Sequence, residues 1–399
     1  MKAYHRGTTY YDPMKCFNGY TLWSPLATVM EGADNAWDRP GEAHLMTMTG
    51  EIVHSWKLPF PTFQCQLLPD GHLLAGMRTT ENPDGQRPGV PPRMMGGTMG
   101  WLMELDWDGN IVFQHKDLAF HHDFKKLPNG NYIYVAWEQL DAETIAKVRG
   151  GVKGSEQQGG VMWSDVYREV DPQGNIVWEW HAKDHLDFDK DIIGCTHPRD
   201  EWSHINDLWV CENGDIVSSS RHLDQVIKVS RATGDIVWRW GSPSYLDEDG
   251  LQINPTEKTL GGPHDAHIIP EGLPGAGHML CYDNAMYRYL SRAVEVDVET
   301  GEVVWQSTPY PNYARGRVPF SAFISGARRM PNGNTVICEG GNSRFYEVTP
   351  DHEVVWEYWR PEPDMKCASP WPVFRCYRFA PDYCPQFASL PPADGIAIL

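Results

Sequence analysis

The segment Gly-Gly-Pro-His-Asp-Ala-His, residues 261–267, holds a histidine in a setting that suggests chemistry. His264 stands six positions before Pro270, which opens a short turn. The equivalent positions before four other turns hold Phe63, His122, Asn206 and Ser325. An imidazole can act as a nucleophile, as a general base or as a metal ligand. Polar side chains at a fixed place in a repeated strand predict a ring of such units around a common centre.

The neighbouring histidines are sorted by the alternation of side chains along a strand. His204 lies two residues before Asn206, so we expect both on the same strand face. His121 and His267 have the opposite parity to the register positions next to them. We expect these two side chains to point elsewhere unless a β-bulge intervenes.

Hairpin register adds an arginine to the candidate cluster. If residues 212–215 form a four-residue turn, Asn206 faces Arg221 across the strand pair. The same count places His122 opposite Trp137. The sequence therefore predicts that Arg221 reaches Asn206 at one end of the inner strands.

The partner of His264 is less closely defined, because the turn that follows its strand is longer. Asp283 and Asn284 mark the expected region. A single histidine on a strand is usually a hydrogen-bonded structural residue. Three histidines, an asparagine and an arginine that converge through one register indicate a functional cluster instead.

These residues are positioned by six copies of a turn followed by Ile/Val-Val and, in most copies, an aromatic residue. The copies begin at Gly50, Gly109, Gly174, Gly234, Gly301 and Asp351. Five further turns lie between them, beginning at Pro69, Pro128, Glu212, Pro270 and Pro331. Each unit has about four strands and no sustained helical period. The repeats predict an all-β fold, a six-bladed β-propeller of four-stranded blades, with an open pair of β-sandwiches as the alternative.

The repeat also divides the chain. We expect an N-terminal arm at residues 1–19, the propeller at 20–358 and an irregular C-terminal tail at 359–399 that packs on it. The inner turns number one fewer than the outer turns. We expect the segment around Tyr20–Trp23 to supply the missing inner strands and to close the ring with the sixth outer hairpin, since a ring must not leave strand edges open. The tail is rich in proline and contains Cys367, Cys376 and Cys384.

Composition limits the partners of the protein. Its 399 residues include 34 Lys and Arg against 53 Asp and Glu, a formal net charge of −19. Such a surface repels nucleic acid and anionic membranes, so we expect neither as a partner. The chain has no 18-residue apolar run, no apolar signal segment at its N-terminus and nine cysteines without CxxC spacing. We therefore expect a cytoplasmic protein that binds a small aromatic substrate, and we make no prediction of its oligomeric state.

Several short segments carry a resemblance to a known family. They are residues 121–124, 127–131, 202–206, 218–221 and 263–266. The most specific are the His-Ile-Asn that ends at Asn206 and the Ser-Ser-Arg that ends at Arg221. Over roughly residues 40–358 the chain resembles the bacterial arylsulfate sulfotransferases. Members of that family are six-bladed propellers that move a sulfuryl group between phenols without a nucleotide donor.

The resemblance implies roles for individual residues. His264 would be the nucleophile that becomes transiently sulfated, and His122 would assist proton transfer on the phenol. His204, Asn206 and Arg221 would bind the sulfuryl oxygens, and no cofactor is expected. Besides Asn206, the candidate substrate-binding residues are His121, Asn284 and Trp137.

Elementary chemistry supports such a transfer independently of the resemblance. Sulfuryl transfer spreads negative charge over three oxygens, much as phosphoryl transfer does. Fixed cationic and N–H donors stabilise that charge. A neutral imidazole is a competent nucleophile, and a second imidazole with a pKa of about 6.5 can move the proton of the phenol.

Two other functions remain open on the sequence. His122, His204 and His264 could bind a divalent transition metal, because imidazole is a common ligand of Zn, Cu and Mn. That site would make the protein a metal-dependent lyase, hydrolase or oxidoreductase acting on an aromatic or sugar compound. A propeller used only as a binding scaffold is the other possibility.

Overall fold

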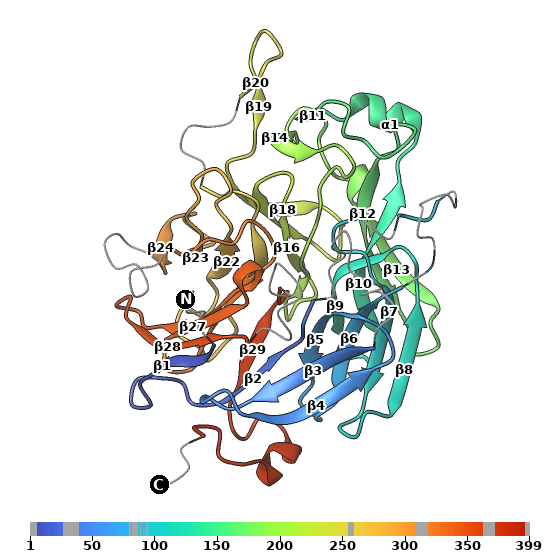
Figure 1. Ribbon diagram of the computed structural model, residues 1–399. Helices are drawn as coiled ribbons and strands as arrows, with labels where there is room; N and C mark the ends of the chain where they lie inside the picture. The colour runs from blue at the N-terminus through green and yellow to red at the C-terminus, as the bar shows by residue number, and fades with distance from the viewer. Residues whose placement is uncertain are drawn as a thin grey trace, which may run out of the picture.

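The computed structural model describes residues 6–26, 40–79, 81, 87, 89–92, 95–253, 259–307, 318–361 and 372–395. Six antiparallel sheets stand around a common centre (Figure 1), which confirms the six-bladed β-propeller. In the second to fifth blades, the strand that comes first in sequence is the innermost, and each following strand lies farther out. We number the blades from one to six in chain order.

The strands of the first three blades are given from the inside outward. The first blade contains β29 (Cys376–Phe379), β2 (Tyr20–Trp23), β3 (Gly41–Met46) and β4 (Ile52–Leu58). The second contains β5 (Thr62–Leu67), β6 (Leu73–Arg78), β7 (Gly100–Leu105) and β8 (Ile111–Lys116). The third contains β9 (Phe120–Lys126), β10 (Tyr132–Gln139), β12 (Trp163–Val170) and β13 (Ile176–His181).

The remaining blades follow the same plan, with one additional strand. The fourth contains β15 (Trp209–Val210), β16 (Ile216–Ser220), β17 (Gln225–Val229) and β18 (Ile236–Gly241). The fifth contains β21 (His264–Ile268), β22 (Met279–Asp283), β23 (Arg292–Val296) and β24 (Val303–Gln306). The sixth contains β25 (Gly326–Arg329), β26 (Thr335–Glu339), β27 (Arg344–Val348), β28 (Val354–Trp359) and β1 (Gly7–Tyr11).

Smaller elements decorate the ring. Two short sheets pair β11 (Gly150–Val152) with β14 (Ile193–Pro198) and β19 (Tyr245–Leu246) with β20 (Gln252–Ile253). The helical segments among the described residues are α1 (Ala142–Lys147), η1 (Ala182–Asp184), η3 (Gly340–Asn342) and η4 (Pro385–Ser389). No helix in the described part of the chain is long and apolar enough to cross a membrane.

Ring closure differs from the sequence prediction. The strand Tyr20–Trp23 pairs with β3 and with β29 of the C-terminal tail, as the adjacent blue and red strands of Figure 1 show. The sixth blade already has its own inner hairpin, so the blade without an innermost strand was the first. The tail is therefore not wholly irregular, since it supplies β29. At the other end of the chain, β1 adds a fifth strand outside β28.

The repeated tryptophans explain how neighbouring blades are joined. The indole N–H of Trp180 donates to the carbonyl of Gly234 at 2.8 Å, which ties the third blade to the outer turn of the fourth. Trp240 binds the carbonyl of Gly301 at 2.9 Å in the same way. Trp356 binds the carbonyl of Met48 at 2.7 Å and so joins the sixth blade to the first. Each indole thus satisfies its polar atom at a blade boundary, while the rings of Trp180 and Trp356 are buried and that of Trp240 is partly buried.

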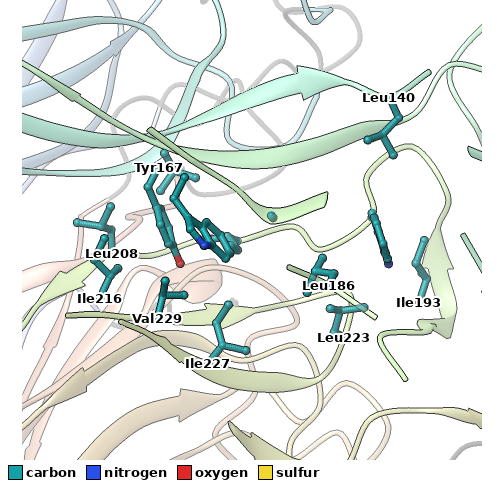
Figure 2. Packing of buried hydrophobic residues seen from close by; sticks show 14 of the residues in the cluster. Leu140, Tyr167, Leu186, Ile193, Leu208, Ile216, Leu223, Ile227 and Val229 are labelled. Atoms are coloured by element: carbon teal, nitrogen blue, oxygen red, sulfur yellow. The ribbon is translucent and has the colours of Figure 1, made fainter. Parts of the chain in front are cut away.

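Apolar side chains fill the space between blades. Figure 2 shows the cluster between the third and fourth blades, where Tyr167 lies close to Val229. The hydroxyl of Tyr167 donates to Ser218 Oγ at 2.8 Å, so this polar group is also paired. Such a continuous packed core holds the inner strands in fixed positions.

Candidate active site

A β-bulge places two histidines of the third blade together. Tyr134 pairs with Phe124 but Val135 pairs with His121, so His122 and Asp123 are extra residues on β9. His122 has the left-handed φ of 53°, which is uncommon outside glycine. This bulge is the exception that the parity argument allowed, and it places His121 beside His122.

Two side chains behind His122 form a chain of contacts with it. Nδ1 of His121 lies 2.7 Å from Nδ1 of His122, and Nε2 of His121 lies 3.3 Å from Asp165 Oδ1. The ring of Trp137 stacks on His121 with a centroid separation of 4.0 Å. Trp137 is not the strand partner of His122, because the bulge shifts the register and His121 pairs with Val135 instead.

His264 is held on both ring nitrogens. Its Nδ1 lies 2.7 Å from Asn284 Oδ1, in the region predicted for its partner. The amide nitrogen of Asn284 donates to the carbonyls of Ser321 and Ile324, so its oxygen must face the imidazole and accept from Nδ1–H. Nε2 accepts from the backbone N–H of Ile324 at 3.1 Å. Burial, followed by the charge of Arg221, lowers the pKa of His264 to about 3.

His204 lies next to His122, with ring centroids 4.7 Å apart. Its Nδ1 is 3.0 Å from Oε2 of Glu201, and the same oxygen accepts from the indole N–H of Trp137 at 3.1 Å. Burial and the neighbouring His222 lower the pKa of His204, while burial and Asp200 raise the pKa of Glu201. Both shifts favour the neutral forms of this pair.

Arg221 reaches the site in a different register from the predicted one. Its backbone N–H donates to the carbonyl of His204 at 3.0 Å, so its strand neighbour is His204 and not Asn206. The strand pairing differs from the predicted one for two reasons. The turn is shorter than expected, because Cys211 pairs with Asp215, and the register shifts once more at the bridge between Ile205 and Ser220.

The guanidinium of Arg221 has few partners of its own. Within the described ranges, its one hydrogen bond runs from Nη2 to Met286 Sδ at 3.7 Å. Burial lowers its pKa, but a guanidinium stays charged at any physiological pH. A positive group with unused donors beside His204 and His264 is suited to an anion.

The sequence predicted that Asn206 binds substrate, and in the structure its side chain bonds to two groups of the protein. Its amide nitrogen donates to the carbonyl of Pro263 at 2.9 Å, and its oxygen accepts from Ser219 Oγ at 2.6 Å. It is fully buried. The contact with Pro263 ties the fourth blade to the residue directly before His264.

His267 lies apart from this cluster. A bulge between His264 and His267 separates the two, and the His267 ring faces Trp209 at a centroid separation of 5.4 Å. The expectation that it points away from His264 agrees with this position.

Sequence reasoning missed several members of the site. Asp165 lies on the third strand of its blade and Glu201 on a connecting loop, so neither occupies the register position that revealed the histidines. Arg375 comes from the tail, where no repeat predicted an inward-facing residue. His222, which stacks on His204 at 4.5 Å, directly follows Arg221 and could have been noticed by that proximity.

The alternative of a divalent metal at His122, His204 and His264 depends on how close their donor atoms lie to one another. Among the described residues, the one group of three or more potential ligands with donor atoms within 4.8 Å of one another is Asp70, His72 and Glu104. That group lies in the second blade, and Lys126 and Tyr132 already bind the Glu104 carboxylate. His122, His204 and His264 have the positive Arg221 beside them, which opposes a cation.

Comparisons with solved structures find several chains that are similar to this one at low sequence identity. A protein of unknown function from Bacteroides caccae is 12 % identical with a TM-score of 0.50, covering 91 % of this chain and 99 % of that one. A catalytically inactive virginiamycin B lyase from Staphylococcus aureus is 11 % identical with a TM-score of 0.43, covering 93 % and 94 %. Apo AztD from Citrobacter koseri is 9 % identical with a TM-score of 0.42, covering 91 % and 99 %. No curated protein matches the chain.

Fold and site together define a six-bladed β-propeller in which two inner-strand imidazoles, His122 and His264, lie near the imidazole of His204 and the guanidinium of Arg221. The chain belongs to the arylsulfotransferase (ASST) family, whose sequence model matches residues 26–369. Membership of this family supports an enzyme with a sulfotransferase-like function.

Proposed function

We propose that the protein transfers a sulfuryl group from a phenolic sulfate ester to a phenolic acceptor through a sulfohistidine at His264. The observation that carries this proposal is the orientation of His264 by Asn284. Because Nδ1–H donates to the amide oxygen, Nε2 is the unprotonated nitrogen with a lone pair. A low pKa of about 3 keeps the imidazole neutral at physiological pH, and a neutral imidazole is the nucleophilic form.

In the first half of the reaction, His264 Nε2 forms a bond to sulfur while the bond from sulfur to the aryl oxygen breaks. The aryl oxygen keeps the electron pair and leaves as a phenoxide. Ile324 N–H must release Nε2 before this attack. Arg221 stabilises the negative charge on the sulfuryl oxygens.

In the second half, the acceptor phenol gives its proton to His122 and its oxygen forms a bond to sulfur. His122, whose pKa burial lowers well below its usual value, then gives up the proton, which restores the neutral ring and balances the phenoxide released in the first half. The bond between sulfur and nitrogen breaks, and its electron pair returns to His264 Nε2. Within the described residues, Nδ1 is the one ring nitrogen of His122 with a hydrogen bond, so Nε2 is available for this proton. The transfer needs no nucleotide or metal cofactor.

Aromatic side chains near these groups favour a phenolic substrate. Phe63 and Phe374 lie at centroid separations of 6.0 and 6.2 Å from the His122 ring. Phe323, directly before Ile324, is 42 % exposed. Phe63 and Phe374 are buried, so among these three rings that of Phe323 offers an exposed flat surface on which a phenol can stack.

The test is a transfer assay with 4-nitrophenyl sulfate as donor and phenol as acceptor. We expect nitrophenol release that depends on phenol, and a sulfuryl adduct on the peptide that contains His264 after incubation with donor alone. The variant His264→Gln should lose both signals. The matched control is His352→Gln in an outer turn, which should keep them. Release of nitrophenol without acceptor, or an unmodified His264 peptide, would count against the proposal.

A further inference from the structure

A buried chain of three side chains ends at His122. Asp165 Oδ1 lies 3.3 Å from His121 Nε2, and His121 Nδ1 lies 2.7 Å from His122 Nδ1. Asp165 comes from β12, whereas both histidines belong to β9. The exposed fractions of Asp165, His121 and His122 are 1 %, 0 % and 3 %, so solvent does not compete for these contacts.

The two members of this chain that lie behind His122, namely Asp165 and His121, are fixed in orientation. Asp165 Oδ2 accepts from the backbone N–H of Ile205 at 3.0 Å and from the hydroxyl of Ser203. Those bonds leave Oδ1 as the carboxylate oxygen that lies 3.3 Å from His121 Nε2. The imidazole of His121 cannot turn freely, because Trp137 stacks on its face at 4.0 Å.

The order of groups determines where the protons lie. An ionised carboxylate only accepts, so His121 Nε2 must carry its proton toward Asp165. A neutral imidazole has one donor and one acceptor, which makes His121 Nδ1 an acceptor. The proton between the two rings then belongs to His122 Nδ1, and His122 Nε2 is left unprotonated.

We propose that Asp165 and His121 are positioning residues that hold His122 in the tautomer with a basic Nε2. The arrangement follows the logic of a carboxylate that orients a catalytic imidazole, extended by one additional ring. Neither Asp165 nor His121 touches the substrate or exchanges a proton with it.

The proton balance of the step is simple. When the acceptor phenol transfers its proton to His122 Nε2, the ring becomes an imidazolium that keeps Nδ1–H on His121. His121 keeps its Nε2–H toward Asp165, so the negative carboxylate, 3.3 Å from His121 Nε2, stabilises the new positive charge through the hydrogen bond between the two rings. The inference rests on the proposed function only for the identity of the proton donor.

The test replaces Asp165 with asparagine. Its amide oxygen can keep the bonds from Ser203 and Ile205, while its NH₂ group donates to His121 Nε2. That change inverts the tautomer of His121 and then of His122, whose Nε2 becomes protonated. We expect kcat for sulfuryl transfer to fall about 10³–10⁴-fold with KM changed less than about threefold, as for a carboxylate-to-amide change behind a catalytic histidine.

Tautomers are read directly by ¹⁵N NMR on protein labelled at histidine, with His122 assigned from the spectrum of His122→Gln. We expect the Nδ1–H tautomer of His122 in the natural protein and the Nε2–H tautomer in Asp165→Asn. The control Ser203→Ala removes one bond to Asp165 but leaves the chain intact, so it should show the Nδ1–H tautomer.

The spectra separate this inference from the proposed function, because they require no turnover. A natural protein with His122 protonated at Nε2 would overturn the inference, and so would a folded Asp165→Asn protein with an unchanged tautomer. If Asp165→Asn does not fold, the His122 tautomer in the spectrum of the natural protein alone decides whether the inference holds. Correct tautomers without sulfuryl transfer would leave the positioning role standing and reject only the proposed reaction.

Discussion

Arg375 Nη1 lies 2.5 Å from Asp123 Oδ2 inside the ring, although the two residues are 252 positions apart in the sequence. The same guanidinium reaches Asp265 Oδ1 through Nε at 3.1 Å and the carbonyl of Asn206 through Nη2 at 3.2 Å. The C-terminal tail thereby connects the third, fourth and fifth blades. Burial raises the pKa of Asp123, but the charge of Arg375 overrides it and leaves that pKa below its usual value.

Replacing Arg375 by methionine should destabilise the protein strongly. Two buried carboxylates would lose their common cation, and breaking a buried ion pair on one side costs about 3–5 kcal/mol. Urea denaturation measures the change in the free energy of unfolding. The matched control is Arg149→Met, whose side chain is half exposed and pairs with Asp189, and it should change that free energy by less than about 1 kcal/mol. Equal effects of the two variants would refute the role of Arg375.

Replacing Gly97 by alanine should damage the site more than the fold. Gly97 has a φ of +87°, and a Cβ there would lie 2.1–2.3 Å from atoms of the His122 ring. We expect kcat/KM for sulfuryl transfer to fall at least about 100-fold, because small displacements of a catalytic group are costly.

Gly109 provides the control for this substitution. It has the same φ of +87° but no heavy atom within 4 Å of the position of a Cβ. Gly109→Ala should therefore show only the backbone cost of about 1–2 kcal/mol in unfolding, with normal activity. An active Gly97→Ala enzyme would mean that His122 tolerates displacement.

Acid should destabilise the protein through its buried imidazoles. The pKa of His264 is about 3 in the folded protein and about 6.5 when unfolded, so between these values the unfolded chain binds more protons. The free energy of unfolding must therefore fall as the pH drops below about 6.5. One group contributes roughly 2 kcal/mol between pH 6.5 and 5, at 1.36 kcal/mol per pKa unit. Urea titrations at these two pH values should show a smaller difference for His264→Gln than for the natural protein.

Asn284→Asp should shift the pH dependence of the reaction. A carboxylate in place of the amide would stabilise the protonated form of His264 and raise its pKa above the natural value of about 3. The acidic limb of the kcat/KM profile should then move to higher pH. The change also removes the donors to the carbonyls of Ser321 and Ile324, so thermal unfolding should occur at a lower temperature. An unmoved acidic limb would show that His264 does not limit the rate in acid.

The repeat made the ring and part of the site predictable. Turns and apolar strands recur in the sequence, and aligning them singled out His122, Asn206 and His264, of which His122 and His264 lie on inner strands and Asn206 lies just before β15. The bulge at His122 could not be predicted, because a left-handed histidine is selected by its surroundings and not by its own preference. Asp165 also escaped detection, since its role depends on a contact between different strands.

Closure by β29 has a consequence for synthesis. A ribosome makes β2 long before β29, so the first blade has an unpaired inner edge until residues 376–379 have emerged. Asp123 and Asp265 likewise cannot pair with the guanidinium of Arg375 until that residue has been made. A chain cut short before Arg375 would thus lack both the strand that completes the first blade and the positive charge that Asp123 and Asp265 share. Quality control could distinguish such an incomplete protein by its exposed strand edge, long before any substrate reached it.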